Sequence, residues 1–166
     1  MAEENEQPQE EGKEPSFQLV RCFLKDASLE MPHAPDIFLE EHKEQPGVNF
    51  RFDVGTRAMP VQDHYEVLLR VTVTVGFKEK AMFLVECNQC GIFEIKNVPA
   101  ESIQHITNVV SPSLMLPYVR ANVADLINRT GLPTVQLPEV NFEGLYAQKV
   151  QEVMAKGEKK EETATA

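Results

Sequence analysis

The segment Cys87-Asn88-Gln89-Cys90 has the spacing of a metal or redox motif. A structural zinc site needs four ligands, usually two such pairs or one pair with two spaced histidines. The third cysteine, Cys22, and the four histidines follow no such pattern. A redox pair sits at a helix N-terminus, whereas this pair lies in a run of strand-forming residues, where positions three apart point to opposite faces. We therefore expect no metal site and no disulfide here, and interpret the two thiols as packing residues.

Asp26, Glu30 and His33 form the cluster that could best supply a general acid and a general base. We interpret these three residues as solvated groups at the end of a strand, and keep a small acid/base enzyme that uses them as an alternative. The chain contains no GxGxxG or GxxxxGK[ST] loop and no GxSxG or HExxH motif. We therefore expect no ATP-driven activity and no cofactor, and favour a protein that is not an enzyme.

The charge of the chain limits its partners. The formal net charge is −10 over 166 residues, and no stretch is rich in lysine or arginine, so nucleic acid is not an expected partner. Residues 25–45 contain six acidic residues and two lysines. Such a run usually forms a solvated face. The alternative is an acidic docking surface for a basic partner, where complementary charge speeds encounter and sets specificity.

The two ends of the chain differ from its middle. Residues 1–15 and 156–166 lack large apolar side chains, so we expect two disordered tails around one folded domain at 16–155. The first 15 residues have no secretory signal pattern, and no apolar run approaches the roughly 20 residues of a membrane span. Three cysteines cannot all pair, which favours a reducing compartment. We expect a cytoplasmic protein with no direct membrane insertion.

The first half of the folded part has the periodicity of strands. From Tyr65 onward the odd positions are apolar and the even positions mostly polar, which is typical of a strand with one buried face. Four segments are predicted to be strands: Ser16–Leu29, Val48–Val54, Tyr65–Val75 and Ala81–Ile95. Because no helical crossover separates them, an antiparallel sheet is favoured.

The second half has helical periodicity. We expect a helix from Pro99, interrupted at Ser111-Pro112-Ser113 and interrupted or restarted at Pro117. Gly131 is a plausible C-cap, and Asn141 a plausible N-cap for a last helix. Strands followed by helices predict an α+β fold: a four-stranded antiparallel sheet with helices packed on one face.

An adaptable apolar groove is a further hypothesis. Phenylalanine and methionine repack around varied ligands, and the chain has nine Phe and six Met but no Trp. The default interpretation of the aromatic residues is a core. The groove hypothesis uses Val48, Phe50 and Phe52 with Phe142, Leu145 and Tyr146.

Five segments occur in a specific order: Lys25–Glu30 leading into Pro32–Pro35, Tyr65–Thr74, Phe83–Phe93, Leu116–Arg120 and Pro138–Phe142. In order and spacing, over about Phe17 to Val153, they resemble the bacterial protein-export chaperone family SecB. Cys90 departs from the pattern, since a glycine is common there, and the long acidic N-terminal tail is not a family feature. The resemblance implies a homotetramer, assembled as a dimer of dimers. It also implies an ATP-independent holdase that keeps secretory precursors unfolded and delivers them to the SecA ATPase.

The resemblance also implies roles for particular residues. In the family, SecA docks on an acidic surface of the sheet, and the matching positions here are Asp26, Glu30, Leu84 and Glu86. The opposite strand face matches positions tied to subunit assembly, which are Val85, Cys87 and Gln89. The docking segment of SecA is basic and carries its own zinc, so no metal is expected in this chain. The rival interpretations are the small acid/base enzyme and an acidic adaptor without a client groove.

Overall fold

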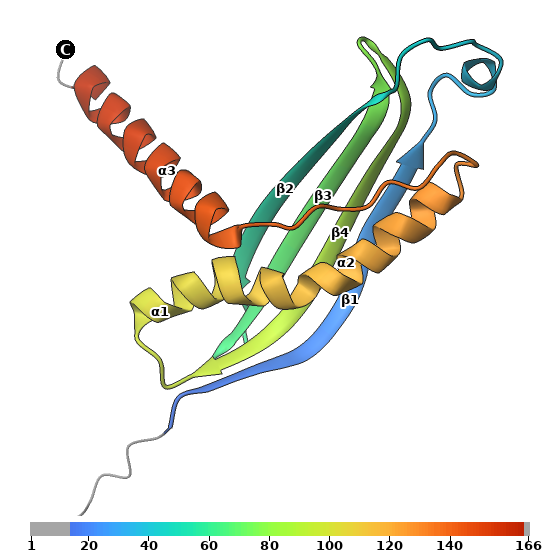
Figure 1. Ribbon diagram of the computed structural model, residues 1–166. Helices are drawn as coiled ribbons and strands as arrows, with labels where there is room; N and C mark the ends of the chain where they lie inside the picture. The colour runs from blue at the N-terminus through green and yellow to red at the C-terminus, as the bar shows by residue number, and fades with distance from the viewer. Residues whose placement is uncertain (1–13, 165–166) are drawn as a thin grey trace, which may run out of the picture.

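The computed structural model describes residues 14–164, with side chains as far as Lys156, and contains a four-stranded antiparallel sheet crossed by helices (Figure 1). The strands are β1 (Ser16–Glu30), β2 (Gly47–Ala58), β3 (His64–Phe77) and β4 (Lys80–Lys96). Their order across the sheet is β1-β4-β3-β2. A short 3-10 turn, η1 (Asp36–Phe38), lies in the connection from β1 to β2. The predicted strands and their antiparallel pairing are confirmed.

The two faces of the sheet differ as the alternation predicted. Val67, Leu69, Val71 and Val73 of β3 have no exposed surface, whereas the residues between them remain half-buried or exposed. We call the face that carries these valines and Leu69, beneath the helices, the inner face, and the opposite one the outer face.

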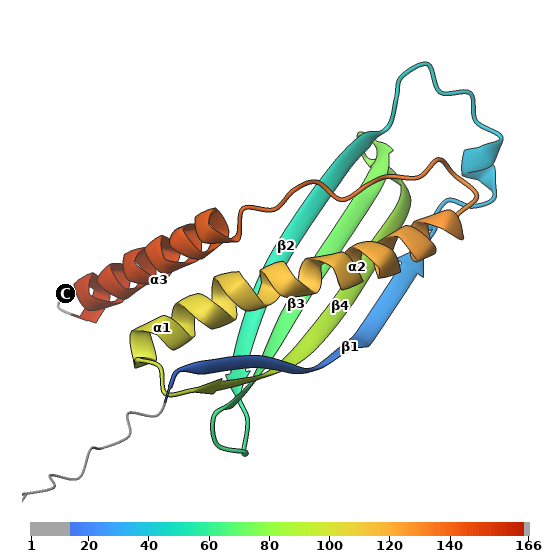
Figure 2. The same cartoon turned by 60° about the horizontal axis from the view of Figure 1, so that its bottom comes forward.

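The first part of the helical half, Ala100–Asn128, is one continuous rod rather than a set of interrupted helices. α1 (Ala100–His105), a π-helical turn η2 (Ile106–Val110) and α2 (Ser111–Asn128) follow one another without a break (Figure 2). The predicted interruptions at Pro112 and Pro117 are therefore wrong. The wider π turn precedes Pro112, where an α-helix would bring the proline ring against the preceding carbonyl. Pro117 lies on the exposed side of α2, so the carbonyl that its missing N–H leaves free faces water.

The core lies between α2 and the inner face. Met115, Val119, Val123 and Ile127 point from α2 onto the sheet and are at most 1% exposed, and burial of each such side chain contributes roughly 1.5–3 kcal/mol. The helix approaches the sheet closely at Gly91 of β4. A Cβ there would lie 2.6 Å from Cε2 of Phe93 and 3.1 Å from Sδ of Met115, so a glycine is required.

The last helix, α3 (Phe142–Ala164), begins as predicted and extends beyond the edge of the sheet, on the side of β2 (Figure 1). The backbone N–H of Gly144 donates to Oδ1 of Asn141 at 3.0 Å, which confirms Asn141 as the N-cap. The helix continues to Ala164, past residue 155, where we expected the folded domain to end. Its last residues are mostly Lys, Glu and Ala, which favour helix. The expected N-terminal tail lies outside the described residues as far as residue 13.

Within residues 14–164, we find no helix that is both long enough and apolar enough to span a membrane.

Candidate functional site on the outer face and beside α3

The outer face carries three carboxylates on neighbouring strands. In the antiparallel register, Ser28 of β1 lies opposite Glu86 of β4. Asp26 and Glu30 are two residues to either side of Ser28, so Glu86 is diagonal to both, at about 7–8 Å. Leu84 lies directly opposite Glu30. We call Asp26, Glu30, Leu84 and Glu86 the acidic surface; the structure brings all four onto one face of the β1–β4 pair.

Most of the charge of the acidic surface is left without a cation. Asp26 and Glu30 are exposed, and neither forms an ion pair within the part of the chain that the structure describes. Glu86 is the exception, because Nε of Arg70 lies 3.8 Å from its Oε1. Arg70 is also held by Asn88, whose Oδ1 accepts a hydrogen bond from Nε at 2.9 Å. The surface therefore keeps a negative potential that suits a basic ligand.

The same geometry argues against acid/base catalysis by Asp26 and Glu30. Four residues along a strand place the two carboxylates about 13 Å apart. A general acid and base that share one small reacting group must each reach it within hydrogen-bond distance. The two side chains can contact one extended partner but not one reacting bond.

The residues expected at a subunit interface lie inside the chain. Val85 and Cys87 have no exposed surface and belong to the core. Gln89 is 2% exposed, donates from Nε2 to Sγ of Cys22 and accepts at Oε1 from Asn122 of α2. A side chain without exposed surface cannot touch a second copy directly, so a role of Val85 and Cys87 in subunit assembly stays a prediction and must act through the residues packed on them. These residues instead support α2 from below.

Cys87 and Cys90 face opposite sides of the sheet, as their spacing predicted. Cys87 packs in the core, whereas Cys90 lies beneath the side chain of Glu66 on the outer face. Burial, with a smaller effect of the nearby carboxylates Asp26 and Glu66, raises the pKa of both thiols to about 11. No group of metal-ligating residues occurs among the described residues.

At neutral pH, iodoacetamide is expected to alkylate Cys22 well before Cys87 or Cys90 in the native protein. Cys22 is half-buried, whereas the other two thiols are fully buried, and a raised pKa leaves less reactive thiolate. Mass spectrometry of timed samples measures the order, and the same reaction in concentrated urea gives the reference in which all three react. Alkylation of Cys87 or Cys90 as fast as Cys22 would contradict this assignment.

A groove lies beside α3, between this helix, the π turn and β2. It has a cavity volume of about 360 Å³. Its apolar lining comes from Phe52 and Val54 of β2 and from Leu145 and Tyr146 of α3. We call this cavity the α3 groove. A second hollow of about 340 Å³ continues along α3 past Tyr146 to Val153 and Met154, both about two-thirds exposed. Apolar surface of this kind can hold an extended, greasy segment.

The structure gathers half of the residues expected in a client groove. Phe52, Leu145 and Tyr146 line the α3 groove. Phe142 is 3% exposed and is part of the core, while Phe50 packs against that core. Val48 lies in a different hollow, near the β3–β4 turn. The part of Val48, Phe50 and Phe142 in a client groove therefore stays a prediction. Strand alternation puts Val48 and Phe50 on the same face of β2 as Phe52, but the α3 groove includes only Phe52 of the three.

Two polar residues of the α3 groove were missed by the sequence analysis. Nζ of Lys149 donates to the backbone carbonyl of Val54 at 2.8 Å and lies 3.5 Å from Oδ1 of Asn108. Asn108 belongs to the π turn, and its Nδ2 donates to the carbonyl of Gln104 at 2.9 Å. The contact spans 95 residues in sequence between Lys149 and Val54, and no local pattern could have revealed it.

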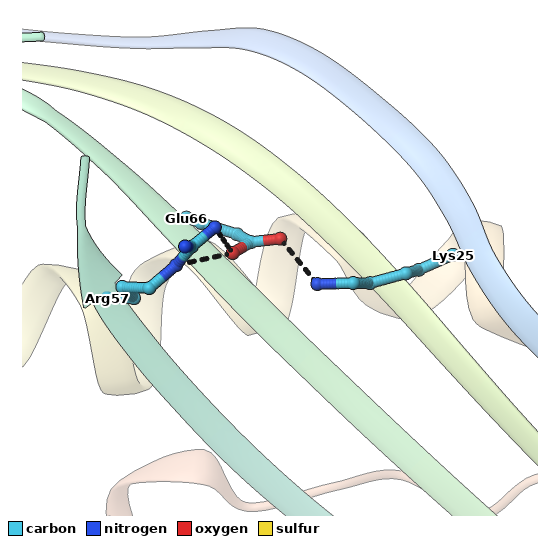
Figure 3. A network of polar contacts seen from close by, with 3 residues as sticks. All are labelled: Lys25, Arg57 and Glu66. Atoms are coloured by element: carbon cyan, nitrogen blue, oxygen red, sulfur yellow. Dashed lines mark hydrogen bonds and ion pairs between the residues drawn. The ribbon is translucent and has the colours of Figure 1, made fainter. Parts of the chain in front are cut away.

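A second missed feature is an ion network across the outer face (Figure 3). Glu66 of β3 accepts from Lys25 of β1 at 3.0 Å and from Nε of Arg57 of β2 at 2.9 Å. Its side chain is only 11% exposed. The hydrogen bond from Lys25, followed by that from Arg57, lowers the pKa of Glu66.

Comparison with known proteins places this arrangement in a family. Residues 10–153 match the family "Preprotein translocase subunit SecB". The protein-export protein SecB of Bordetella petrii is 46% identical over 154 residues, which cover 92% of this chain and 86% of the relative. That of Verminephrobacter eiseniae is 49% identical over 135 residues, covering 81% and 86%.

A solved structure supports the fold. A SecB-like chaperone of Mycobacterium tuberculosis, in complex with a peptide from an antitoxin, superposes with a TM-score of 0.61 at 15% identity. The match covers 75% of this chain and 91% of that one. The fold agrees with what the family model and the sequence relatives show: this chain belongs to the SecB family of protein-export chaperones.

Proposed function

We propose that this protein is an ATP-independent holdase that binds unfolded secretory precursors in the cytoplasm and delivers them to SecA. Membership of a chaperone family decides against the enzyme alternative. The observation that carries the proposal is the pairing of an open apolar groove with a separate acidic surface on the other face of the sheet.

The α3 groove supports capture of unfolded chains. Burial of any apolar segment against its apolar lining contributes roughly 25 cal/mol of binding free energy per Å² of buried surface. This contribution does not depend on a particular sequence. A client that folds quickly buries such segments itself and escapes. Selection by folding rate therefore needs no nucleotide, and the acidic adaptor without a groove is the less favoured alternative.

The acidic surface supports delivery to a basic partner. The carboxylates of Asp26, Glu30 and Glu86 lie on one face of the β1–β4 pair together with Leu84. Complementary charge steers encounter, and an apolar contact at the centre adds binding energy. We assign SecA as this partner and these four residues as the docking site.

Exposed apolar side chains support assembly as a dimer of dimers. Leu114 and Tyr118 on the side of α2 away from the sheet are 46% and 50% exposed, and Val20 and Leu24 on the edge strand β1 are 49% and 45% exposed. Patches of this kind mark protein interfaces. We propose that α2 and β1 carry the contacts, and that Val85, Cys87 and Gln89 act on assembly by holding α2 in place.

Suppression of aggregation tests the proposal. The protein is expected to keep a slow-folding precursor soluble without ATP, at equimolar tetramer and precursor, and native mass spectrometry is expected to give a tetramer. A protein that binds SecA but leaves the precursor to aggregate would be an adaptor. A monomer that does not suppress aggregation would contradict the chaperone assignment itself.

A further inference from the structure

A lysine lies next to the acidic surface in sequence, yet it does not neutralise that surface. The register of β1 against β4 shifts between Leu24 and Asp26, so Lys25 is the extra residue of a β-bulge. A bulge sets two residues against one on the partner strand. The side chains of Lys25 and Asp26 therefore both lie on the outer face. Opposite charges at adjacent positions there would be expected to form an ion pair.

Glu66 holds Lys25 elsewhere. The Nζ atom of Lys25 lies 3.0 Å from Oε1 of Glu66. The other carboxylate oxygen of Glu66 accepts from Nε and Nη2 of Arg57, at 2.9 and 2.5 Å. The hydrogen bonds from Lys25 and Arg57 lower the pKa of Glu66 despite its partial burial, so its carboxylate is charged at neutral pH and is held from both sides (Figure 3).

The register shows that Glu66 draws the lysine away from the docking residues. Glu66 lies opposite Ile92 of β4, and Asp26 lies opposite Asn88 of the same strand. Four residues along a strand correspond to about 13 Å. The lysine side chain is therefore directed along the strands toward Glu66 and away from Asp26.

We propose that Glu66 is a positioning residue for the docking of a basic partner: it binds Lys25 and so keeps Asp26 free of its neighbouring cation. This inference rests on the proposed function, in which the acidic surface binds SecA. Glu66 itself touches no partner in this scheme. Its own charge, about 13 Å along the sheet from Asp26, lies beyond the screening length of about 8 Å at physiological ionic strength.

The structure offers a matched control in Arg57. This residue binds the same carboxylate, but it sits on β2, three strands from β1, or about 14 Å across the sheet. Once released, Lys25 can reach Asp26, while Arg57 cannot. Substitution of Lys25 or of Arg57 removes one cation from Glu66 in either case. Only the substitution of Lys25 also removes a cation that can reach the acidic surface.

The test compares Lys25→Gln, Glu66→Gln, Lys25→Gln/Glu66→Gln and Arg57→Gln/Glu66→Gln for binding to purified SecA in low salt. Glu66→Gln is expected to weaken binding about two- to fivefold, the range of one exposed ion pair. Removal of Lys25 in the first double variant is expected to restore binding to the level of Lys25→Gln alone. Removal of Arg57 is expected to restore nothing. The thermal midpoint of each variant shows whether the sheet is intact.

The outcomes separate this inference from the function on which it rests. Unchanged binding of Glu66→Gln, or equal weakness in both double variants, would overturn the positioning role while SecA binding by the unsubstituted protein stands. If the unsubstituted protein does not bind SecA, or if Glu30→Lys binds as well as it does, the docking function itself is wrong.

Discussion

Glu86→Lys and Glu30→Lys are each expected to abolish SecA binding while client holding persists. Each substitution reverses a charge in the triangle formed with Asp26, so a basic partner meets repulsion where it met attraction. Loss of a charge pair in an interface costs about 2–5 kcal/mol, which is roughly thirtyfold to several thousandfold in affinity. Isothermal titration with SecA measures the loss, and aggregation suppression measures the retained activity.

The control is the same reversal at Glu94, which lies on the same strand eight positions from Glu86, about 26 Å away. Glu94 is paired with Lys96 at 2.6 Å, and its reversal is expected to leave SecA binding within a few-fold of normal. Added salt is expected to weaken the unsubstituted complex, because the attraction between exposed charges is screened. Normal SecA binding by both Glu30→Lys and Glu86→Lys in low salt would show that docking occurs elsewhere.

Leu145→Glu is expected to remove most of the aggregation suppression and to spare SecA binding. Leu145 lines the α3 groove together with Phe52, so a carboxylate at position 145 must be desolvated whenever an apolar segment enters. Desolvation of an unpaired charge costs several kcal/mol, and we expect at least a tenfold weaker hold on the precursor. The measurement is the concentration of chaperone that halves the aggregation rate.

Val48→Glu provides the matched control. Val48 lies on the same face of β2 as Phe52, is 43% exposed and lines the separate hollow near the β3–β4 turn. It is expected to suppress aggregation nearly as well as the unsubstituted protein. Tyr146→Glu serves as a second groove variant should Leu145→Glu change the native mass. Equal activity of both groove variants and the control would remove the α3 groove from the proposal.

The sheet was predictable because its signal is local. Alternation along β3 alone separates the inner from the outer face, and the buried valines confirm it. The helical rod was not predictable, because a proline normally ends a helix and the π turn that accommodates Pro112 has no recognisable sequence pattern. The end of α3 was missed because the charged composition of residues 156–164 is compatible with a solvated tail and with a helix.

The candidate site was predictable only where residues lie close along one strand pair. The family resemblance supplied all four residues of the acidic surface, and simple alternation agreed in placing Leu84 and Glu86 on one face. The Lys25–Glu66–Arg57 network joins three strands and depends on the register, which the sequence does not reveal. The α3 groove depends likewise on where a helix docks, so alternation could select Phe52 but could not exclude Val48.

The contact of Lys149 with the edge strand β2 has a consequence for a protein that binds unfolded chains. An unpaired strand edge is a template on which extended polypeptides stack, and natural sheets commonly blunt such edges with lysine. Here the lysine comes from α3 and not from the edge strand itself, and its Nζ already donates a hydrogen bond to the carbonyl of Val54. A chain that added to β2 as a fifth strand would have to displace Lys149 from this carbonyl, so the contact disfavours edge-to-edge stacking at this point of the sheet.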